Sequence, residues 1–139
     1  MQTRVYLTDN CGEIVFDRLL VEYLKARGSH VTVAVRDAPI LNDATMEDAL
    51  ALGFDRFADR LTTTGAGAEI GLDLEKIPPD LAEAIDNCTI ILSKGMANYE
   101  SLSEYDSLPP VAYLMCVKCE VIAEDIGIPR GSKIALLRK

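Results

Sequence analysis

Apolar residues along the chain form six short runs, separated by longer stretches with helical spacing. Most of these runs are continuously apolar, which is typical of strands covered on both faces, and the stretches between them are long enough for crossover helices. The pattern predicts an α/β fold with a mostly parallel sheet of five or six strands. The runs are Val5–Thr8, Val31–Val35, Arg60–Thr64, Thr89–Ser93, Val111–Cys116 and Lys133–Leu137.

Five helices are predicted between these runs. The first, Glu13–Arg27, has apolar residues repeating at three and four positions, and Gly28 is its stop signal. In the second, Met46–Leu52, Thr45 is the predicted N-cap, and Asp48 completes an arrangement similar to a capping box. The other three predicted helices are Pro78–Ile85, Asn98–Glu104 and Lys118–Ile126.

The length of the chain and its internal pattern favour one domain over residues 1–139. A chain of 139 residues buries roughly two thirds of the surface that it exposes when unfolded, so it can form a substantial core. The segment Thr62–Leu72 carries glycines at 65, 67 and 71, a spacing that misses the dinucleotide-binding fingerprint by one position. We expect a mobile loop there.

Charge and hydropathy exclude two classes of partner. Acidic residues outnumber basic ones 22 to 14, for a formal net charge of -8, and binding to nucleic acid phosphates depends on clustered Lys and Arg. No apolar run approaches the ~18 residues of a membrane span, and the first residues do not resemble a signal peptide. We therefore expect a cytoplasmic protein that binds neither nucleic acid nor membrane.

The four cysteines, with no signal peptide before them, are expected to be free thiols rather than a disulfide framework. Cys116 and Cys119 have the spacing of a zinc or redox pair, but the sequence holds no second such pair and His30 is its only histidine. Two partly buried thiols are the better interpretation.

Polar residues gather where the predicted strands end. In a parallel α/β sheet, ligands bind just beyond the carboxyl ends of the strands. Carboxylate and amide oxygens there suit a hard divalent cation, and Mg²⁺ is usually held by one or two carboxylates together with water and substrate phosphate. Lysines and helix N-termini add positive potential for that phosphate. The polar residues in question are Asp9, Asn10, Glu13, Asp17, Arg36, Asp37, Asn42, Asp43, Lys94, Asn98 and Lys118.

The same residues also fit a simpler interpretation, in which they have no functional role. Asp9 and Asn10 would cap the first helix, Asp43 would sit in an Asx turn before Thr45, and the lysines would be solvated. Spacing and composition alone leave both interpretations open.

Four sequence blocks in order resemble the damage-control phosphatase family, also described as acidic-residue-methyltransferase-like and as domain of unknown function 89. The resemblance extends from residue 6 to about residue 123. It implies a Rossmann-like three-layer α/β/α domain that holds a divalent metal ion (Mg or Mn, possibly Co or Ni) and hydrolyses phosphomonoesters of small metabolites. Sugar phosphates and damaged intermediates such as phosphopantetheine derivatives are the implied substrates. The blocks are DNCGEIVFD at 9–17, APILNDATMEDA at 38–49, KGMANYESL at 94–102 and VKC at 117–119.

The resemblance also implies roles for individual residues. Asp9, Asn10 and Asp43 match the metal-binding positions, and Lys118 matches a lysine on the phosphate side. Gly95 and Asn98 match a Gly-x-x-Asn segment that binds substrate, while Glu13 and Asn42 match supporting positions. Together with Arg36 and Lys94, these residues form the predicted substrate site, in which Asp9, Glu13 and Lys118 are the candidate catalytic residues.

The sequence departs from the family pattern in two respects. Family members carry a helical region of comparable size before the first motif, whereas this chain starts with its first predicted strand. We therefore expect either the metal-binding domain alone, natural or as a fragment, or a lid that a partner chain supplies. The second departure is Arg36, where the family pattern has Lys; Arg keeps the charge and can grip a phosphate with two donors.

The mechanism and the partners stay open at this level. Glu13, Asp17 or Asp37 is the candidate general base, and attack by Asp9 through an aspartyl-phosphate ranks second. A nonenzymatic metal- or phosphate-binding subunit without a lid is the alternative function. Protein carboxyl methylation ranks last, because the chain has no suitable glycine-rich cofactor loop. Apolar surface left by a missing cap would favour a homo-oligomer.

Overall fold

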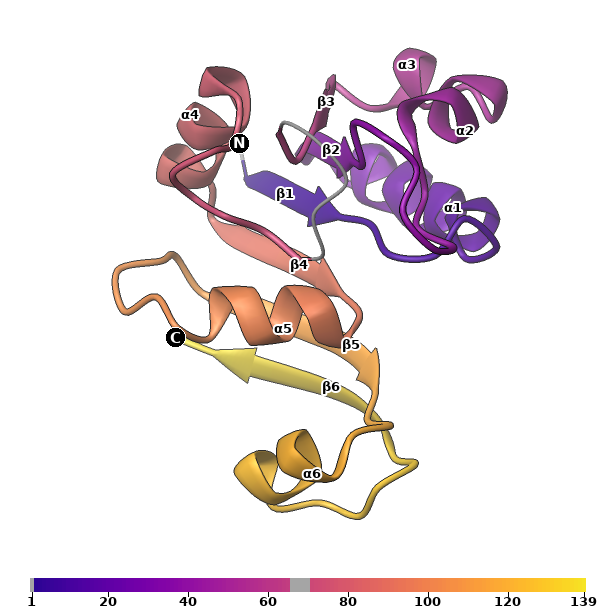
Figure 1. Cartoon of the computed structure of the whole chain (residues 1–139). Helices are drawn as coiled ribbons and strands as arrows, with labels where there is room; N and C mark the ends of the chain where they lie inside the picture. Colours follow the sequence, from indigo (N-terminus) through magenta and orange to yellow (C-terminus); the bar gives the residue numbers. More distant parts are fainter. Residues whose placement is uncertain (1, 66–70) are drawn as a thin grey trace.

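The computed structural model describes residues 2–65 and 71–139, and these residues form a six-stranded sheet with helices packed against it (Figure 1). The strand order is β3-β2-β1-β4-β5-β6, and every neighbouring pair is parallel except β5 and β6. The mostly parallel sheet predicted from the sequence is confirmed. The strands are β1 (Thr3–Leu7), β2 (His30–Val35), β3 (Arg60–Thr63), β4 (Ile90–Lys94), β5 (Val111–Cys116) and β6 (Lys133–Arg138).

All five predicted helices are present, with ends shifted by a few residues. The predicted capping box of α2 is also present, since the Thr45 hydroxyl accepts from the Asp48 N–H and the Asp48 carboxylate accepts from the Thr45 N–H. The short helix α3 was not predicted, because four residues are too few to show a helical repeat. The helices are α1 (Ile14–Ala26), α2 (Met46–Ala51), α3 (Phe54–Phe57), α4 (Pro79–Asn87), α5 (Met96–Leu102) and α6 (Glu120–Ile126).

Side chains of the central strands alternate between two apolar cores, one on each face of the sheet. In β1, Val5 and Leu7 belong to the core formed with α4, α5 and α6, whereas Tyr6 belongs to the core formed with α1, α2 and α3. Such alternation is the two-residue period of a strand buried on both faces. The result is the predicted three-layer α/β/α architecture.

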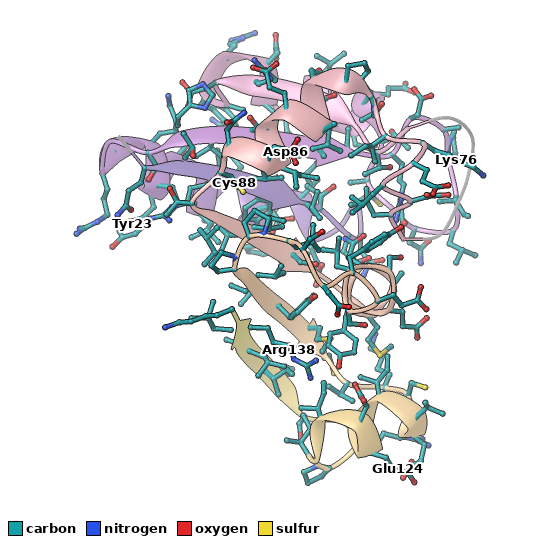
Figure 2. The ribbon with its side chains drawn as sticks, turned by 90° about the vertical axis from the view of Figure 1, so that its left-hand side faces the viewer. Tyr23, Lys76, Asp86, Cys88, Glu124 and Arg138 are labelled. Atoms are coloured by element: carbon teal, nitrogen blue, oxygen red, sulfur yellow. The ribbon has the colours of Figure 1, made fainter. Side chains whose placement is uncertain are left out.

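Helix α1 has apolar residues on two sides. Ile14 and Val21 are buried under it, while Phe16, Leu19 and Tyr23 are 71%, 62% and 57% exposed. Figure 2 shows Tyr23 at the surface of the molecule. An exposed apolar stripe on a helix is a usual feature of a docking surface. The stripe is consistent with the predicted homo-oligomer or partner chain, which remains a prediction.

The chain path creates a crevice beside β1. After β1 the chain builds β2 and β3 on one side of it, and then returns to place β4 on the other side. Such a switch point, at the carboxyl ends of two neighbouring parallel strands, is where α/β proteins bind ligands. Within the predicted mobile segment Thr62–Leu72, Thr62 and Thr63 belong to β3, and residues 66–70 lie outside the described residues. In the described part of the chain, no helix is long and apolar enough to cross a membrane.

A candidate metal centre at the switch point

Asp9 and Asn10 lie at the mouth of this crevice. They follow the last residue of β1, Leu7, which pairs with Ser93 of β4. The N-cap position of α1 is Glu13, and no side chain caps it. Asp9 and Asn10 therefore do not cap the first helix with their side chains, and that part of the simpler interpretation is wrong.

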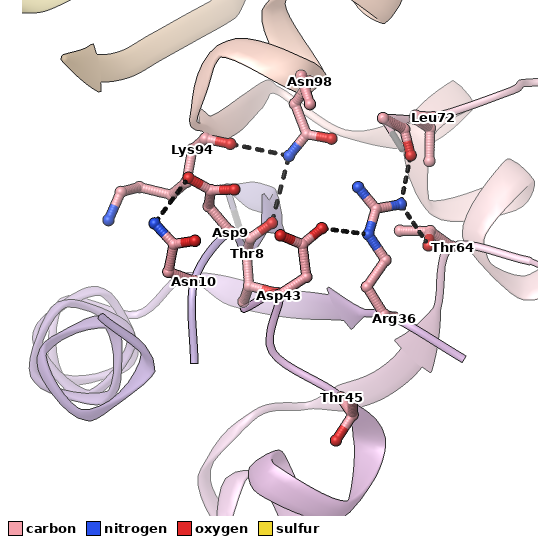
Figure 3. Close-up of polar contacts among 12 residues, drawn as sticks. Thr8, Asp9, Asn10, Arg36, Asp43, Thr45, Thr64, Leu72, Lys94 and Asn98 are labelled. Atoms are coloured by element: carbon pink, nitrogen blue, oxygen red, sulfur yellow. Dashed lines mark hydrogen bonds and ion pairs between the residues drawn. The ribbon is translucent and has the colours of Figure 1, made fainter. Parts of the chain in front are cut away.

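Asp43 reaches the same place because its segment pairs with the end of β1. Asn10 and Asp43 form an antiparallel bridge, and the Ala44 N–H donates to the Asp9 carbonyl at 2.8 Å. The Asn42 carbonyl accepts from the Cys11 N–H at 2.6 Å. Figure 3 shows the side chains of Asp9, Asn10 and Asp43 pointing into one space. The structure thus brings the three predicted ligands together, and their role as ligands remains a prediction.

Arg36 is held behind Asp43 and is only 5% exposed. Its Nε donates to Asp43 Oδ2 at 2.9 Å, and its Nη1 donates to Thr64 Oγ1 at 3.1 Å and to the Gly71 carbonyl. Arg36 was predicted to bind the substrate phosphate; its contacts orient Asp43, and a role in phosphate binding remains a prediction. Its partners Thr64 and Gly71 were not predicted, because both contacts join segments that are distant in sequence.

Gly95, the residue after β4, lies against the Asp9 carboxylate. A Cβ atom at position 95 would be 2.3 Å from Asp9 Oδ2, and the Gly95 backbone has a φ of +86°. Both observations exclude a side chain at this position. Gly95 was predicted to belong to the site, and its lack of a side chain leaves room for the Asp9 carboxylate.

The charges around Asp9 are those of a site prepared for a cation. Burial raises the pKa of Asp9 to about 6, with further contributions from the negative charges of Asp43 and Glu13; the positive charges of Lys94 and Arg36 oppose the rise. The Asn10 Nδ2 donates to Asp9 Oδ2 at 3.4 Å, which leaves the Asn10 Oδ1 as an acceptor. A bound divalent cation would offset the repulsion among the acids.

Lys94, at the end of β4, lies among acidic side chains. Its Nζ donates to Asp17 Oδ1 at 2.9 Å and lies 3.6 Å from Glu13 Oε2. The Tyr6 hydroxyl donates to the same Asp17 oxygen at 2.6 Å. Tyr6 was not among the predicted site residues, and its only signal in the sequence was a hydroxyl in the middle of an apolar strand.

Lys118 faces a small cavity at the carboxyl edge of the sheet. The cavity has a volume of about 80 Å³ and includes two of the predicted metal ligands and the candidate base Glu13. The Lys118 side chain is exposed, so its ammonium is free to approach a ligand from solvent. The cavity is lined by Asp9, Asn10, Glu13, Gly95, Met96, Leu114, Met115, Cys116 and Lys118.

Three other predicted residues have different positions. Asn98 is buried, and its Nδ2 donates to the carbonyls of Thr8 at 3.2 Å and Lys94 at 2.9 Å, so it ties the end of β1 to α5. Its Oδ1 is buried and has no hydrogen-bond partner among the described residues. Asn42 is exposed and contributes its backbone carbonyl, and Asp37 is exposed outside the cavity lining.

The donor set fits a hard cation. In residues 2–65 and 71–139, no three His, Cys, Asp or Glu side chains gather closely enough to hold a metal ion. The candidate centre instead offers two carboxylates and one amide, and Mg²⁺ commonly takes one or two carboxylates and keeps several waters. The raised pKa of Asp9, caused by burial and by the negative charges of Asp43 and Glu13, supports the same fit, because a bound cation would stabilise the ionised carboxylate. Cys116 and Cys119 are free thiols, as are Cys11 and Cys88.

Comparison with known protein families decides the assignment. The family model described as the damage-control phosphatase ARMT1-like domain matches residues 1–134. The chain belongs to this family. The resemblance carried by the four sequence blocks is therefore confirmed.

Individual damage-control phosphatase relatives match nearly the whole chain. The chain is 47% identical over 131 residues to a damage-control phosphatase of Archaeoglobus fulgidus, and the alignment covers 94% of this chain and 45% of the relative. It is also 31% identical over 136 residues to the damage-control phosphatase PH1575 of Pyrococcus horikoshii, and this alignment covers 97% of the chain and 46% of the relative.

A solved structure of the same family has the same fold. The crystal structure of a DUF89 family protein, PH1575 from Pyrococcus horikoshii, superposes with a TM-score of 0.91 at 30% identity, over 99% of this chain and 48% of that chain. The chain thus spans about half the length of the damage-control phosphatases that it matches.

Proposed function

We propose that this chain is the metal-binding domain of a phosphatase that hydrolyses phosphomonoesters of small metabolites. The metal would be magnesium or manganese, with cobalt or nickel as later transition-metal alternatives. Sugar phosphates and damaged phosphometabolites such as phosphopantetheine derivatives are the proposed substrates. The membership of the chain in the damage-control phosphatase family supports this class of reaction.

The observation that carries the proposal is the convergence of three oxygen donors at the switch point. Asp9 and Asn10 come from the end of β1, and the Asn10–Asp43 bridge brings Asp43 to them from the loop after β2. The Gly95 backbone and Arg36 support this arrangement from two sides. Because these contacts join the segments that follow β1, β2 and β4, the sheet as a whole maintains the donor set.

The residues around the centre have distinct proposed tasks. Asp9, Asn10 and Asp43 would hold the cation, which when bound polarises the phosphoryl group and neutralises developing charge. Lys118 would approach the phosphate from the exposed side of the cavity. Glu13, on the same cavity, would accept the proton of the attacking water. Because Asp9 would be a ligand of the cation, its carboxylate is less free to attack phosphorus as a nucleophile.

A second candidate function is binding without catalysis. The chain spans about half the length of its relatives, and a lid that excludes water and shapes substrate specificity would come from another segment or chain. In that case the domain would bind metal and phosphate but turn over slowly or not at all.

The test is hydrolysis of p-nitrophenyl phosphate and a panel of sugar phosphates with magnesium, manganese, cobalt or nickel. The informative variant is Asp43→Asn, since its amide oxygen still accepts from the buried Arg36 Nε, whereas an alanine would leave that Nε without a partner. Asp55→Asn is the matched control, because Asp55 is an exposed acid outside the cavity lining. Metal-dependent turnover that is lost only in Asp43→Asn supports the enzyme. Metal binding without turnover on the whole panel supports the binding function.

A further inference from the structure

Asp17 is a buried acid with no route to a substrate. It is 3% exposed, and its Oδ1 accepts from the Tyr6 hydroxyl at 2.6 Å and from Lys94 Nζ at 2.9 Å. Its Oδ2 is buried and has no hydrogen-bond partner within the described residues. A buried carboxylate requires a partner charge, so the Lys94 ammonium is its counter-ion. Of the three candidate bases, Asp17 is therefore the one that is sealed in the interior.

Lys94 connects this buried acid to the edge of the site. Its side chain is 18% exposed, and its Nζ lies between Asp17 and Glu13, 3.6 Å from Glu13 Oε2. Figure 3 shows the ammonium pointing away from the Asp43 carboxylate. Lys94 thus makes its ion pairs with the two acids near the start of α1, and it acts on Asp9 of the candidate metal centre through its charge alone.

Glu13 is the member of this group that reaches the cavity. It lines the cavity together with Asp9, Asn10 and Lys118, and its side chain is 46% exposed. Its Oε2 is buried and lies 3.6 Å from the Lys94 ammonium, so the other oxygen, Oε1, is the one placed to accept from a water molecule in the cavity. Asp37, the third candidate base, does not line the cavity.

We propose that Tyr6, Asp17 and Lys94 form a positioning chain, which holds the Glu13 carboxylate at the cavity so that Glu13 receives the proton of the attacking water. Lys94 acts through Glu13 and does not bind the phosphate. This inference rests on the proposed phosphatase function and assigns the residues behind its general base.

In the proposed step, water attacks the phosphoryl group and Glu13 accepts its proton. The water oxygen bonds to phosphorus, one water O–H bond breaks and its proton moves to Glu13. The bond from phosphorus to the ester oxygen breaks, and that oxygen leaves with the electron pair and takes a proton from solvent. Glu13 then releases its proton to solvent. With p-nitrophenyl phosphate the leaving group needs no proton, so this substrate isolates the role of the base.

The experiment compares Glu13→Gln, Lys94→Met, Asp17→Asn and Lys118→Met. Lys25→Met is the control, since Lys25 also joins α1 to a neighbouring segment through an ion pair, with Asp59, but does not line the cavity. Calorimetry gives the affinities for manganese and for inorganic phosphate with manganese present. Steady-state kinetics with p-nitrophenyl phosphate give kcat and KM separately.

The inference predicts a kcat-specific loss. Glu13→Gln, Lys94→Met and Asp17→Asn should each lower kcat by about 10²-fold, the usual contribution of a general base, and leave KM and phosphate affinity within about threefold. The double variant Asp17→Asn/Lys94→Met should be no slower than Lys94→Met, since Asp17 acts on Glu13 only through Lys94. Methylammonium should restore part of the kcat of Lys94→Ala, which a merely destabilised fold would not show.

Two results would overturn the inference. One is a loss of phosphate affinity in Lys94→Met as large as that in Lys118→Met, because Lys94 would then be a phosphate ligand. The other is full activity in Glu13→Gln. A wild-type chain that binds manganese and phosphate without hydrolysis would contradict the proposed function instead, and the phosphate affinity of Lys94→Met would still decide the role of Lys94. Absence of both binding and hydrolysis would overturn both.

Discussion

The Asp9 carboxylate lies so close to Gly95 that a Cβ atom on residue 95 would be only 2.3 Å from Asp9 Oδ2. Gly95 follows β4 and Asp9 follows β1, so two neighbouring parallel strands end in one close contact. This contact fixes how far the carboxylate can move toward β4, and it makes Gly95 part of the candidate metal centre although glycine has no side chain to offer.

Gly95→Ala should displace Asp9 and weaken manganese binding by at least tenfold in calorimetry. Strain at a φ of +86° adds a stability cost of about 1–3 kcal/mol. Gly127→Ala is the matched control, because Gly127 has a φ of +83° and open space around its Cβ position. The control should lose stability but keep its metal affinity. Equal affinity in both variants would show that the Asp9–Gly95 contact does not serve metal binding.

Metal affinity should fall on acidification through pH 6. The pKa of Asp9 is raised from 3.8 to about 6 by burial and by Asp43 and Glu13, and a cation competes with the proton for this carboxylate. Calorimetry at pH 7.5, 6.0 and 5.0 should give affinities that decline most steeply below pH 6. A pH-independent affinity would contradict Asp9 as a ligand.

The same shift has the opposite effect on the metal-free fold. A carboxyl group with a raised folded pKa contributes stability that is full below its unfolded pKa of 3.8 and is lost as the pH rises through about 6. Asp9→Asn should therefore raise the melting temperature of the metal-free chain at pH 8 and have a smaller effect at pH 4. It should also abolish any stabilisation by manganese.

Arg36→Lys should weaken the centre although it keeps the charge and restores the family pattern. The contacts of Arg36 with Asp43, Thr64 and Gly71 require the forked guanidinium, and a lysine cannot make all three. Leaving buried groups unpaired costs about 1–3 kcal/mol, measured as the free energy of unfolding in urea. Unchanged stability and manganese affinity would show that Arg36 does not hold Asp43.

The exposed stripe on α1 should mediate self-association. Phe16→Glu/Leu19→Glu should reduce the concentration dependence of the mass in sedimentation, because both side chains are mostly exposed. Val121→Glu, on the exposed side of α6, is the control. A wild-type chain that stays monomeric up to about 200 μM would contradict this prediction.

Much of the fold was predictable because its signals are local. The apolar runs, Gly28 after the first helix and the Thr45–Asp48 capping box each concern residues close together in sequence, and the corresponding elements are present. The strand order was not predictable from these signals, since it depends on pairing between distant segments such as β1 and β4. The four-residue helix α3 was missed for lack of a repeat.

The candidate site divides in the same way. Asp9, Asn10 and Asp43 were found because acids and amides follow predicted strands, and the family resemblance supported them. The Asn10–Asp43 bridge, the burial of Asp17 and the contact of Tyr6 with it depend on tertiary packing. The sequence consequently left three general bases open, and the burial and cavity lining distinguish among them.

The most direct test of the central claim is an anomalous difference map from crystals grown with manganese. We expect one strong peak at the carboxyl ends of β1 and β4, in contact with the side-chain oxygens of Asp9, Asn10 and Asp43. A peak bound elsewhere, with these three side chains contacting only protein or water, would contradict it.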